Sequence, residues 1–188
     1  MKFFFRCVFG IIIICDVMGI LGILPIAPDF TWLGLLATMI FVWTMLEVLQ
    51  LHISVWLLVL VAVILDGASA LLGLYSLIPP WDRLVHFWGG VVAGACALEL
   101  ILGFLEKRYI SVQNKNIFTV ASVFLLVTFL GFLYEFLEYL VDHFQYGYPR
   151  SLVSAYNSIE DQLFNLLGTT IVLGVYYIWK TVKRKNNS

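Results

Sequence analysis

Three acidic side chains lie inside one of the most apolar stretches of the chain, LYEFLEYLVD at 133–142. Their spacing of three and then four residues places Glu135, Glu138 and Asp142 on one face of a helix. Carboxyl groups at membrane depth are costly unless they are protonated, paired or bound to an ion. The pattern therefore predicts either acid/base chemistry or the binding of a divalent cation at this face.

Two further segments carry polar residues at helical spacing, WDRLVHFWGG at 81–90 and SIEDQLFNLLGT at 158–169. Asp82 and His86 are four residues apart, as are Asp161 and Asn165, so each pair shares a helix face. A histidine oriented by a neighbouring carboxylate can transfer protons, and Arg83 beside them can hold an anionic group. These segments therefore supply the other half of a candidate site.

The polar residues fall into two predicted roles, and the cofactor they suit is a divalent cation of undetermined identity. The candidate catalytic residues are His86, Glu135, Glu138 and Asp161, and the candidate substrate-binding residues are Asp82, Arg83, Asp142, Arg150 and Asn165. With Glu160, six acids face two arginines in these segments, so bare phosphate would be repelled. Tyr134 and Tyr139 are instead expected to be aromatic residues of the membrane interface.

The elements that position these residues are membrane helices. Apolar residues make up 62% of the 188 residues and charged residues 12%, and the mean hydropathy is +0.96, which excludes an ordinary soluble domain. A membrane span takes about 20 mostly apolar residues, and six windows qualify: 7–24, 31–51, 53–78, 84–105, 117–141 and 162–180. We predict an all-α, polytopic six-helix bundle that forms a single domain over 1–188.

The distribution of Lys and Arg predicts the orientation of these helices. With the N-terminus inside, nine basic residues lie in cytoplasmic segments and two, Arg83 and Arg150, lie in outer loops. Both termini are therefore expected to be cytoplasmic, and all three polar segments to reach the outer face of a cell membrane. The 142–161 segment is then an outer loop of a length that is often functional.

Small residues on the 84–105 helix predict how the three polar segments meet. Gly90 and Gly94, with Ala93 and Ala97, form stripes on which another helix can pack closely. These stripes lie directly behind His86. Close packing at this position would bring acids of the other helices within reach of the imidazole.

Taken together, the three segments resemble the YjdF-like family of small prokaryotic inner-membrane proteins and, more loosely, the VanZ-like family associated with glycopeptide-antibiotic resistance. A D-[RK]-x-x-H element, an acid-bearing helix and a D-x-x-x-N-x-x-G element recur in those families in that order. The resemblance covers roughly 80–175 and implies site residues at Asp82, Arg83, His86, Glu135, Glu138, Asp161, Asn165 and Gly168. It also covers Pro149, Arg150 and Ser151, and it implies a prokaryotic cytoplasmic membrane but no defined reaction.

Three functions remain open at this point. The first is an outer-leaflet site that binds or acts on the head of an amphipathic or lipid-linked molecule, with membrane lipids as the surrounding partners. The second is a proton- or cation-coupled transporter, since Asp16, Asp66 and Glu99 lie deeper in the membrane. The third is a non-catalytic scaffold whose polar cluster locks helix packing. No basic patch supports nucleic-acid binding, and no P-loop, GxSxG or HExxH motif is present.

Overall fold

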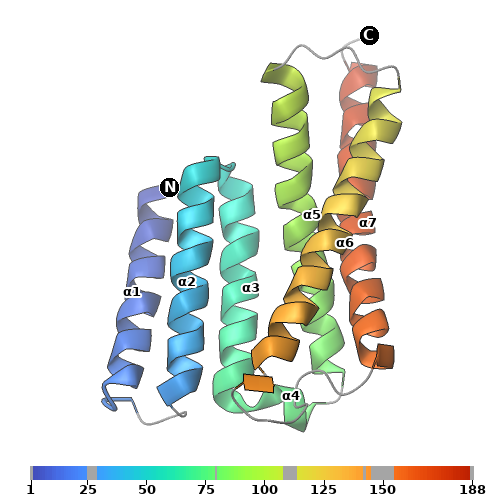
Figure 1. The fold of residues 1–188 in the computed structure, drawn as a ribbon. Helices are drawn as coiled ribbons and strands as arrows, with labels where there is room; N and C mark the ends of the chain where they lie inside the picture. Colours follow the sequence, from blue (N-terminus) through green and yellow to red (C-terminus); the bar gives the residue numbers. More distant parts are fainter. Residues whose placement is uncertain are drawn as a thin grey trace. The chain divides into compact units, whose positions relative to one another are not determined.

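The computed structural model describes residues 2–24, 29–78, 80–107, 114–141, 143–144 and 155–186, and these residues contain helices and no strand. The helices are α1 (Lys2–Ile20), α2 (Asp29–Leu49), α3 (Ile53–Leu72), the single turn α4 (Leu74–Leu77), α5 (Trp81–Lys107), α6 (Lys115–Val141) and α7 (Ala155–Asn186) (Figure 1). Five of them, all but α3 and α4, are long and apolar enough to cross a membrane, and α3 contributes a shorter apolar segment, Ile53–Ser69. The prediction of an all-helical, multi-pass membrane protein is confirmed.

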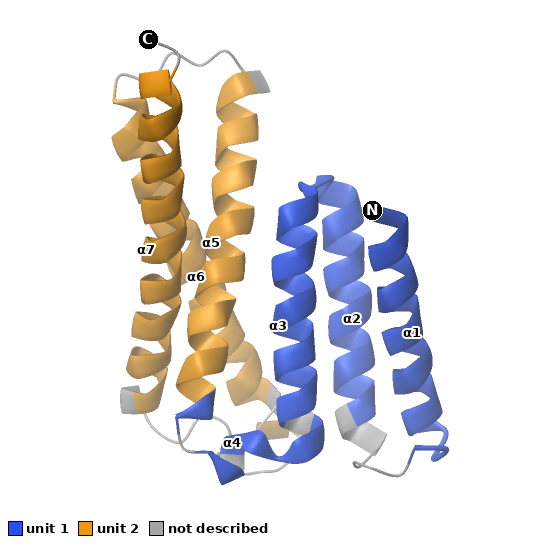
Figure 2. Cartoon of the chain, turned by 180° about the vertical axis from the view of Figure 1, so that it is seen from behind, with its two compact units in different colours: residues 1–81 blue, residues 82–188 orange. Residues whose placement is uncertain are grey.

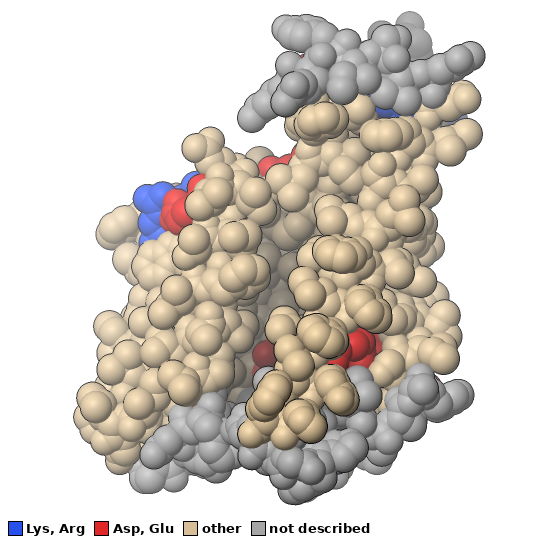
Figure 3. Space-filling view, in the orientation of Figure 1, with Lys and Arg blue, Asp and Glu red and all other residues tan. Residues whose placement is uncertain are grey.

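The surface of the helices is apolar, as a lipid environment requires. Many large hydrophobic side chains are exposed, among them Phe41, Leu125 and Ile178. On the face that Figure 3 shows, residues other than Lys, Arg, Asp and Glu predominate, and the charged residues form a few small patches. In a soluble protein such a surface would aggregate, so it supports a location among lipid chains.

The observed helices differ from the predicted windows at several boundaries, and two of these differences have a clear local cause. The 53–78 window is divided at Gly73, whose φ of 65° is left-handed and ends α3, because this conformation favours glycine. The 162–180 window begins too late, since α7 starts at Ala155, about two turns earlier. Hydropathy detects only the lipid-facing part of a helix, and the first turns of α7 are polar. The windows 31–51 and 53–78 leave a very short connection between the second and third helices, and the structure has a tight turn there, with Gln50 at a φ of 51°.

The chain forms two compact units, Met1–Trp81 and Asp82–Ser188 (Figure 2). The prediction of a single domain stays a prediction. In the first unit, α1 packs against α2 and α3. Its core contains Phe9 and Trp56, whose rings lie 6.0 Å apart, edge to face. Arg6 on α1 forms a two-pronged ion pair with Glu47 on α2, with N–O distances of 2.6 and 2.7 Å.

The second unit consists of α5, α6 and α7, which lie side by side in both views (Figures 1 and 2). A core of Ala97, Leu98, Val123, Val127 and Leu173 joins the three helices. Beyond this core, Lys180 of α7 donates a hydrogen bond to the Asn116 side chain of α6 at 3.0 Å. The start of α5, the end of α6 and the start of α7 therefore share the opposite end of the unit, where the predicted site residues lie.

Candidate functional site

The contact between α5 and α7 positions the candidate site. A Cβ atom on Gly90 would lie 2.0 Å from the backbone oxygen of Asn165, and one on Gly168 would lie 2.2 Å from the backbone oxygen of Phe87. Only glycine permits such an approach, so the two backbones touch here. The predicted close packing behind His86 is confirmed, and α7 is the helix that packs there.

The register of this contact aligns polar residues of both helices. Asn165 meets Gly90 and Thr169 meets Gly94, so Asp161, one turn earlier on α7, meets His86 on α5. The Thr169 hydroxyl lies 2.9 Å from the backbone oxygen of Asn165 and 3.1 Å from that of Gly90, and its proton is shared between them. The deeper part of the contact is thus satisfied by hydrogen bonds within the protein.

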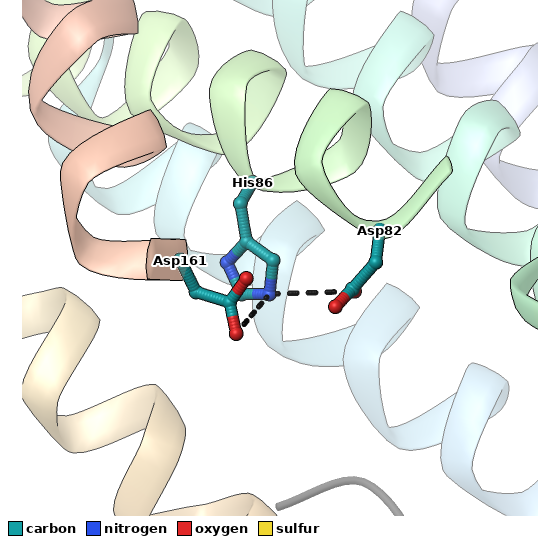
Figure 4. A group of neighbouring side chains, drawn as sticks. All are labelled: Asp82, His86 and Asp161. Atoms are coloured by element: carbon teal, nitrogen blue, oxygen red, sulfur yellow. Dashed lines mark ion pairs between the residues drawn. The ribbon is translucent and has the colours of Figure 1, made fainter. Parts of the chain in front are cut away.

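At the end of the unit, the His86 imidazole lies between two carboxylates (Figure 4). Its Nε2 atom is 3.6 Å from Oδ1 of Asp82 and 3.7 Å from Oδ2 of Asp161. His86 and Asp161 are buried, with 8% and 2% of their surfaces exposed, whereas Asp82 is half-buried. One potential ligand atom from each of the three residues lies within 4.8 Å of the others.

Helix α6 adds two acids and an aromatic ring to this group. Glu135 is buried, and its Oε1 atom has no hydrogen-bond partner among the described residues. Half-buried Glu138 shares a hydrogen bond with Tyr134 and lies close enough to Glu135, Asp82 and Asp161 for their charges to act on it. The Tyr134 ring packs edge to face on His86 at 5.9 Å. Tyr134 therefore contacts the site, and the expectation that it is an aromatic residue of the membrane interface stays a prediction.

We call Asp82, His86, Glu135, Glu138 and Asp161 the acidic cluster. It gathers candidate residues from three helices, as the sequence predicted. Asn165 lies one turn deeper, buried in the α5–α7 contact. The predicted roles of these residues, catalytic or substrate-binding, stay predictions.

Two polar contacts border the acidic cluster. Arg83 forms an ion pair with Glu160 across α5 and α7, with an N–O distance of 2.9 Å. The Asn157 side chain donates a hydrogen bond to Oδ2 of Asp161 at 2.7 Å. Among the described residues, Arg83 is also the cation whose charge acts on Asp161. Since Arg83 already pairs with Glu160, the four carboxylates of the cluster have little positive charge to balance them.

Some predicted residues are not among those that the structure describes. Asp142, Pro149, Arg150 and Ser151 lie outside the described residues. The transporter hypothesis rested on three deeper acids, Asp16, Asp66 and Glu99. The structure shows the hydrogen bonding of the first two. Asp66 accepts a hydrogen bond from Tyr75 at 2.8 Å, and Asp16 is buried with one carboxylate oxygen unpartnered among the described residues. A pathway that links them stays a prediction.

Comparison with known protein families shows to which family the chain belongs. A family model described as "Predicted membrane protein (DUF2238)" matches residues 6–182. The chain belongs to this family. No curated protein and no solved structure matches it. The match includes the whole acidic cluster, so the cluster lies within the part of the chain that defines a DUF2238 protein.

In this DUF2238 protein, sequence reasoning missed three residues around the cluster. Asn157 and Asp161 are four apart, as are Tyr134 and Glu138, so helical spacing carried a signal for both partners. Gln162 had no such signal, because it packs against a different helix. Its amide lies in the space left by Gly131 of α6, and both polar atoms of the amide lack partners among the described residues.

Proposed function

We propose that the acidic cluster binds the polar head of an amphipathic or lipid-linked molecule at the outer leaflet of a prokaryotic cytoplasmic membrane. Within its family the chain would be a YjdF-like member, as the order of its three motifs suggests. The observation that carries the proposal is the convergence of Asp82 and His86 of α5 with Asp161 of α7 at one end of a unit of three membrane helices.

The depth of His86 supports this proposal. His86 lies five residues along α5 from Trp81, which corresponds to about 7 Å at 1.5 Å per residue. The headgroup region on each side of a bilayer is about 5–8 Å thick. With Trp81 at the water-facing edge of the headgroup region, as the proposal requires, the imidazole would lie near the boundary between headgroups and hydrocarbon, where the reacting or charged part of an amphipathic molecule would be found.

The roles of the side chains follow from their chemistry. Glu135 and Glu138 would act as a general acid and base, or would hold a cation that bridges to an anionic head. His86 would transfer a proton, with Asp82 orienting its ring. Arg83 would hold an anionic group, because a phosphate or carboxylate can compete with Glu160 for its planar guanidinium.

The experiment is a comparison of co-purified lipids. Wild-type protein and the variants His86→Gln and Asp161→Asn would be extracted with their surrounding membrane into polymer discs, and the amphipathic molecules identified by mass spectrometry. We expect at least one species to be enriched with wild type and lost from both variants. The matched control is Glu106→Gln, an exposed acid near the other end of α5. Identical lipid profiles for all four proteins would refute the proposal.

A structural scaffold is the second candidate, and one observation favours it. Asn165 and Thr169 lie in the tightest part of the α5–α7 contact, where a buried polar network specifies helix packing. In this reading the acidic cluster extends that network. Loss of folded protein in His86→Gln, instead of loss of a bound molecule from folded protein, would favour the scaffold.

A further inference from the structure

We propose that Asp82, His86 and Asp161 bind one divalent transition-metal ion, with Glu135 as an additional ligand. The inference goes beyond the proposed function, since the protein alone would bind the ion, with or without an amphipathic molecule. It stands on three independent observations: the distances in the cluster, an unpartnered buried carboxylate, and the charge balance.

The distances match those between the ligands of a metal ion. Zinc binds imidazole nitrogen and carboxylate oxygen at about 2.0–2.2 Å, so two ligand atoms of a tetrahedral site lie about 3.3–3.6 Å apart. Nε2 of His86 lies 3.6 Å from the Asp82 oxygen and 3.7 Å from the Asp161 oxygen. Both distances are too long for a hydrogen bond. Around Nε2, an ion would need shifts of only a few tenths of an ångström. The two carboxylate oxygens lie within 4.8 Å of each other, so they would have to approach by up to about 1.5 Å to reach tetrahedral spacing.

Glu135 provides the second observation. Only 7% of this residue is exposed, and its Oε1 atom has no partner among the described residues. Its charge acts on both Asp161 and Glu138, so its carboxyl group lies near the cluster. Glu135 is not among the residues whose ligand atoms lie within 4.8 Å of one another, so its side chain would have to move toward the ion. A buried polar atom without a partner costs roughly 1–3 kcal/mol, and more when the group is charged. Coordination of a metal ion would remove this cost.

The charges around the site also favour a cation. Asp82, Asp161, Glu135 and Glu138 carry four carboxyl groups, and the nearby Arg83 pairs with Glu160 at 2.9 Å. Like charges that are partly removed from water repel each other strongly. A divalent ion would neutralise two of them, and the Asn157 hydrogen bond to Asp161 would orient that ligand, as outer-sphere contacts do in metal sites.

The ligand types indicate which ion would bind. Mg²⁺ and Ca²⁺ prefer oxygen ligands alone, whereas imidazole together with carboxylates suits Zn²⁺, Mn²⁺ or Fe²⁺. The near-tetrahedral spacing around Nε2 favours zinc among these ions. We therefore choose Zn²⁺, and Co²⁺ as its spectroscopic substitute, as the probes.

The test measures metal binding by the purified full chain, carrying an affinity tag that contains no histidine, after removal of metal by a chelator. We expect about one Zn²⁺ per chain by elemental analysis after desalting, and intense visible absorption bands of tetrahedral Co²⁺. Asp161→Asn and His86→Gln should weaken Zn²⁺ binding at least about tenfold. Glu160→Gln and His52→Gln are the matched controls, an acid beside the cluster and a histidine of the first unit.

Three results would overturn the proposal. They are less than about one fifth of an ion per wild-type chain, equal binding by wild type and the two cluster variants, and equal loss of binding in the cluster variants and the controls.

Circular dichroism and size-exclusion chromatography would establish that each variant is folded. Should His86→Gln not fold, Asp82→Asn replaces it, since Asp82 is half-buried and is not part of the α5–α7 backbone contact. Because the assay contains only metal and protein, its outcome is separate from that of the lipid comparison.

Discussion

Replacement of Gly90 by alanine tests whether the α5–α7 contact builds the site. The new Cβ atom would lie 2.0 Å from the backbone oxygen of Asn165, whereas ordinary contact begins at 3.4 Å, so the helices must separate locally by 3.4 − 2.0 = 1.4 Å. Overpacking of this kind costs about 1–3 kcal/mol. For a chain of this length, that lowers the melting temperature by roughly 2–12 °C.

The same separation would also disrupt the metal site. His86 lies one turn from Gly90, and its Nε2 atom is 3.7 Å from Asp161. A local shift of 1.4 Å would place the two atoms about 5 Å apart, whereas two metal bonds reach at most about 4.4 Å. Gly90→Ala should therefore lose Zn²⁺ binding as well as stability, although it changes no ligand.

The assay is thermal unfolding in detergent, followed by circular dichroism, together with Zn²⁺ binding. The matched control is Gly103→Ala on the same helix, where a Cβ atom would meet nothing within 4 Å and the helix gains up to about 1 kcal/mol. On α7, Gly168→Ala and Gly174→Ala form a second pair with the same contrast. A Gly90→Ala protein that melts and binds metal like Gly103→Ala would refute the reasoning.

Three further predictions follow from other parts of the structure. Thr169→Val should lower the melting temperature by roughly 1–6 °C, because it removes a buried hydrogen bond between α5 and α7, while Thr170→Val, whose exposed hydroxyl bonds within α7, should have little effect. Gly19→Ala should destabilise the first unit by about 1–3 kcal/mol, since its Cβ would lie 2.1 Å from the Trp32 ring, and Gly34→Ala, with open space around it, is its control in unfolding assays. Reporters fused to each terminus should both be active on the cytoplasmic side, and activity of an externally active reporter at either end would contradict the predicted orientation.

Helical periodicity predicted that another helix would pack closely on α5 behind His86, because the residues of that contact repeat along a helix, and the structure identifies the helix as α7. The small residues Gly90 and Gly94 recur at the spacing of one turn, as do Asp161 and Asn165. Such spacing determines which residues share a face. The structure pairs these two faces directly, with Asn165 against Gly90 and Thr169 against Gly94.

Contacts between α6 and α7 could not be predicted in this way. Gln162 lies in the space left by Gly131, and neither residue has a partner at helical spacing that would indicate the contact. Such contacts depend on how two helices rotate against each other, which side-chain packing along their whole length determines. The early start of α7 was missed for a related reason, since its first turns are held by contacts such as Arg83 with Glu160 and not by apolar residues.

The stability of Glu135→Gln distinguishes a functional cluster from a structural one. A polar network that exists only to hold helices together should pair its atoms, as Thr169 does, and removal of a member should destabilise the fold. Glu135 is instead buried with an unpartnered oxygen beside other carboxylates. In the metal-free protein, Glu135→Gln removes this repulsion, so we expect stability equal to wild type or higher by roughly 0.5–2 kcal/mol. Zn²⁺ should then stabilise wild type more than the variant, because the ion binds folded wild-type protein more tightly than it binds the folded variant. A metal-free Glu135→Gln protein that unfolds as readily as Gly90→Ala would instead assign the carboxylate to the scaffold.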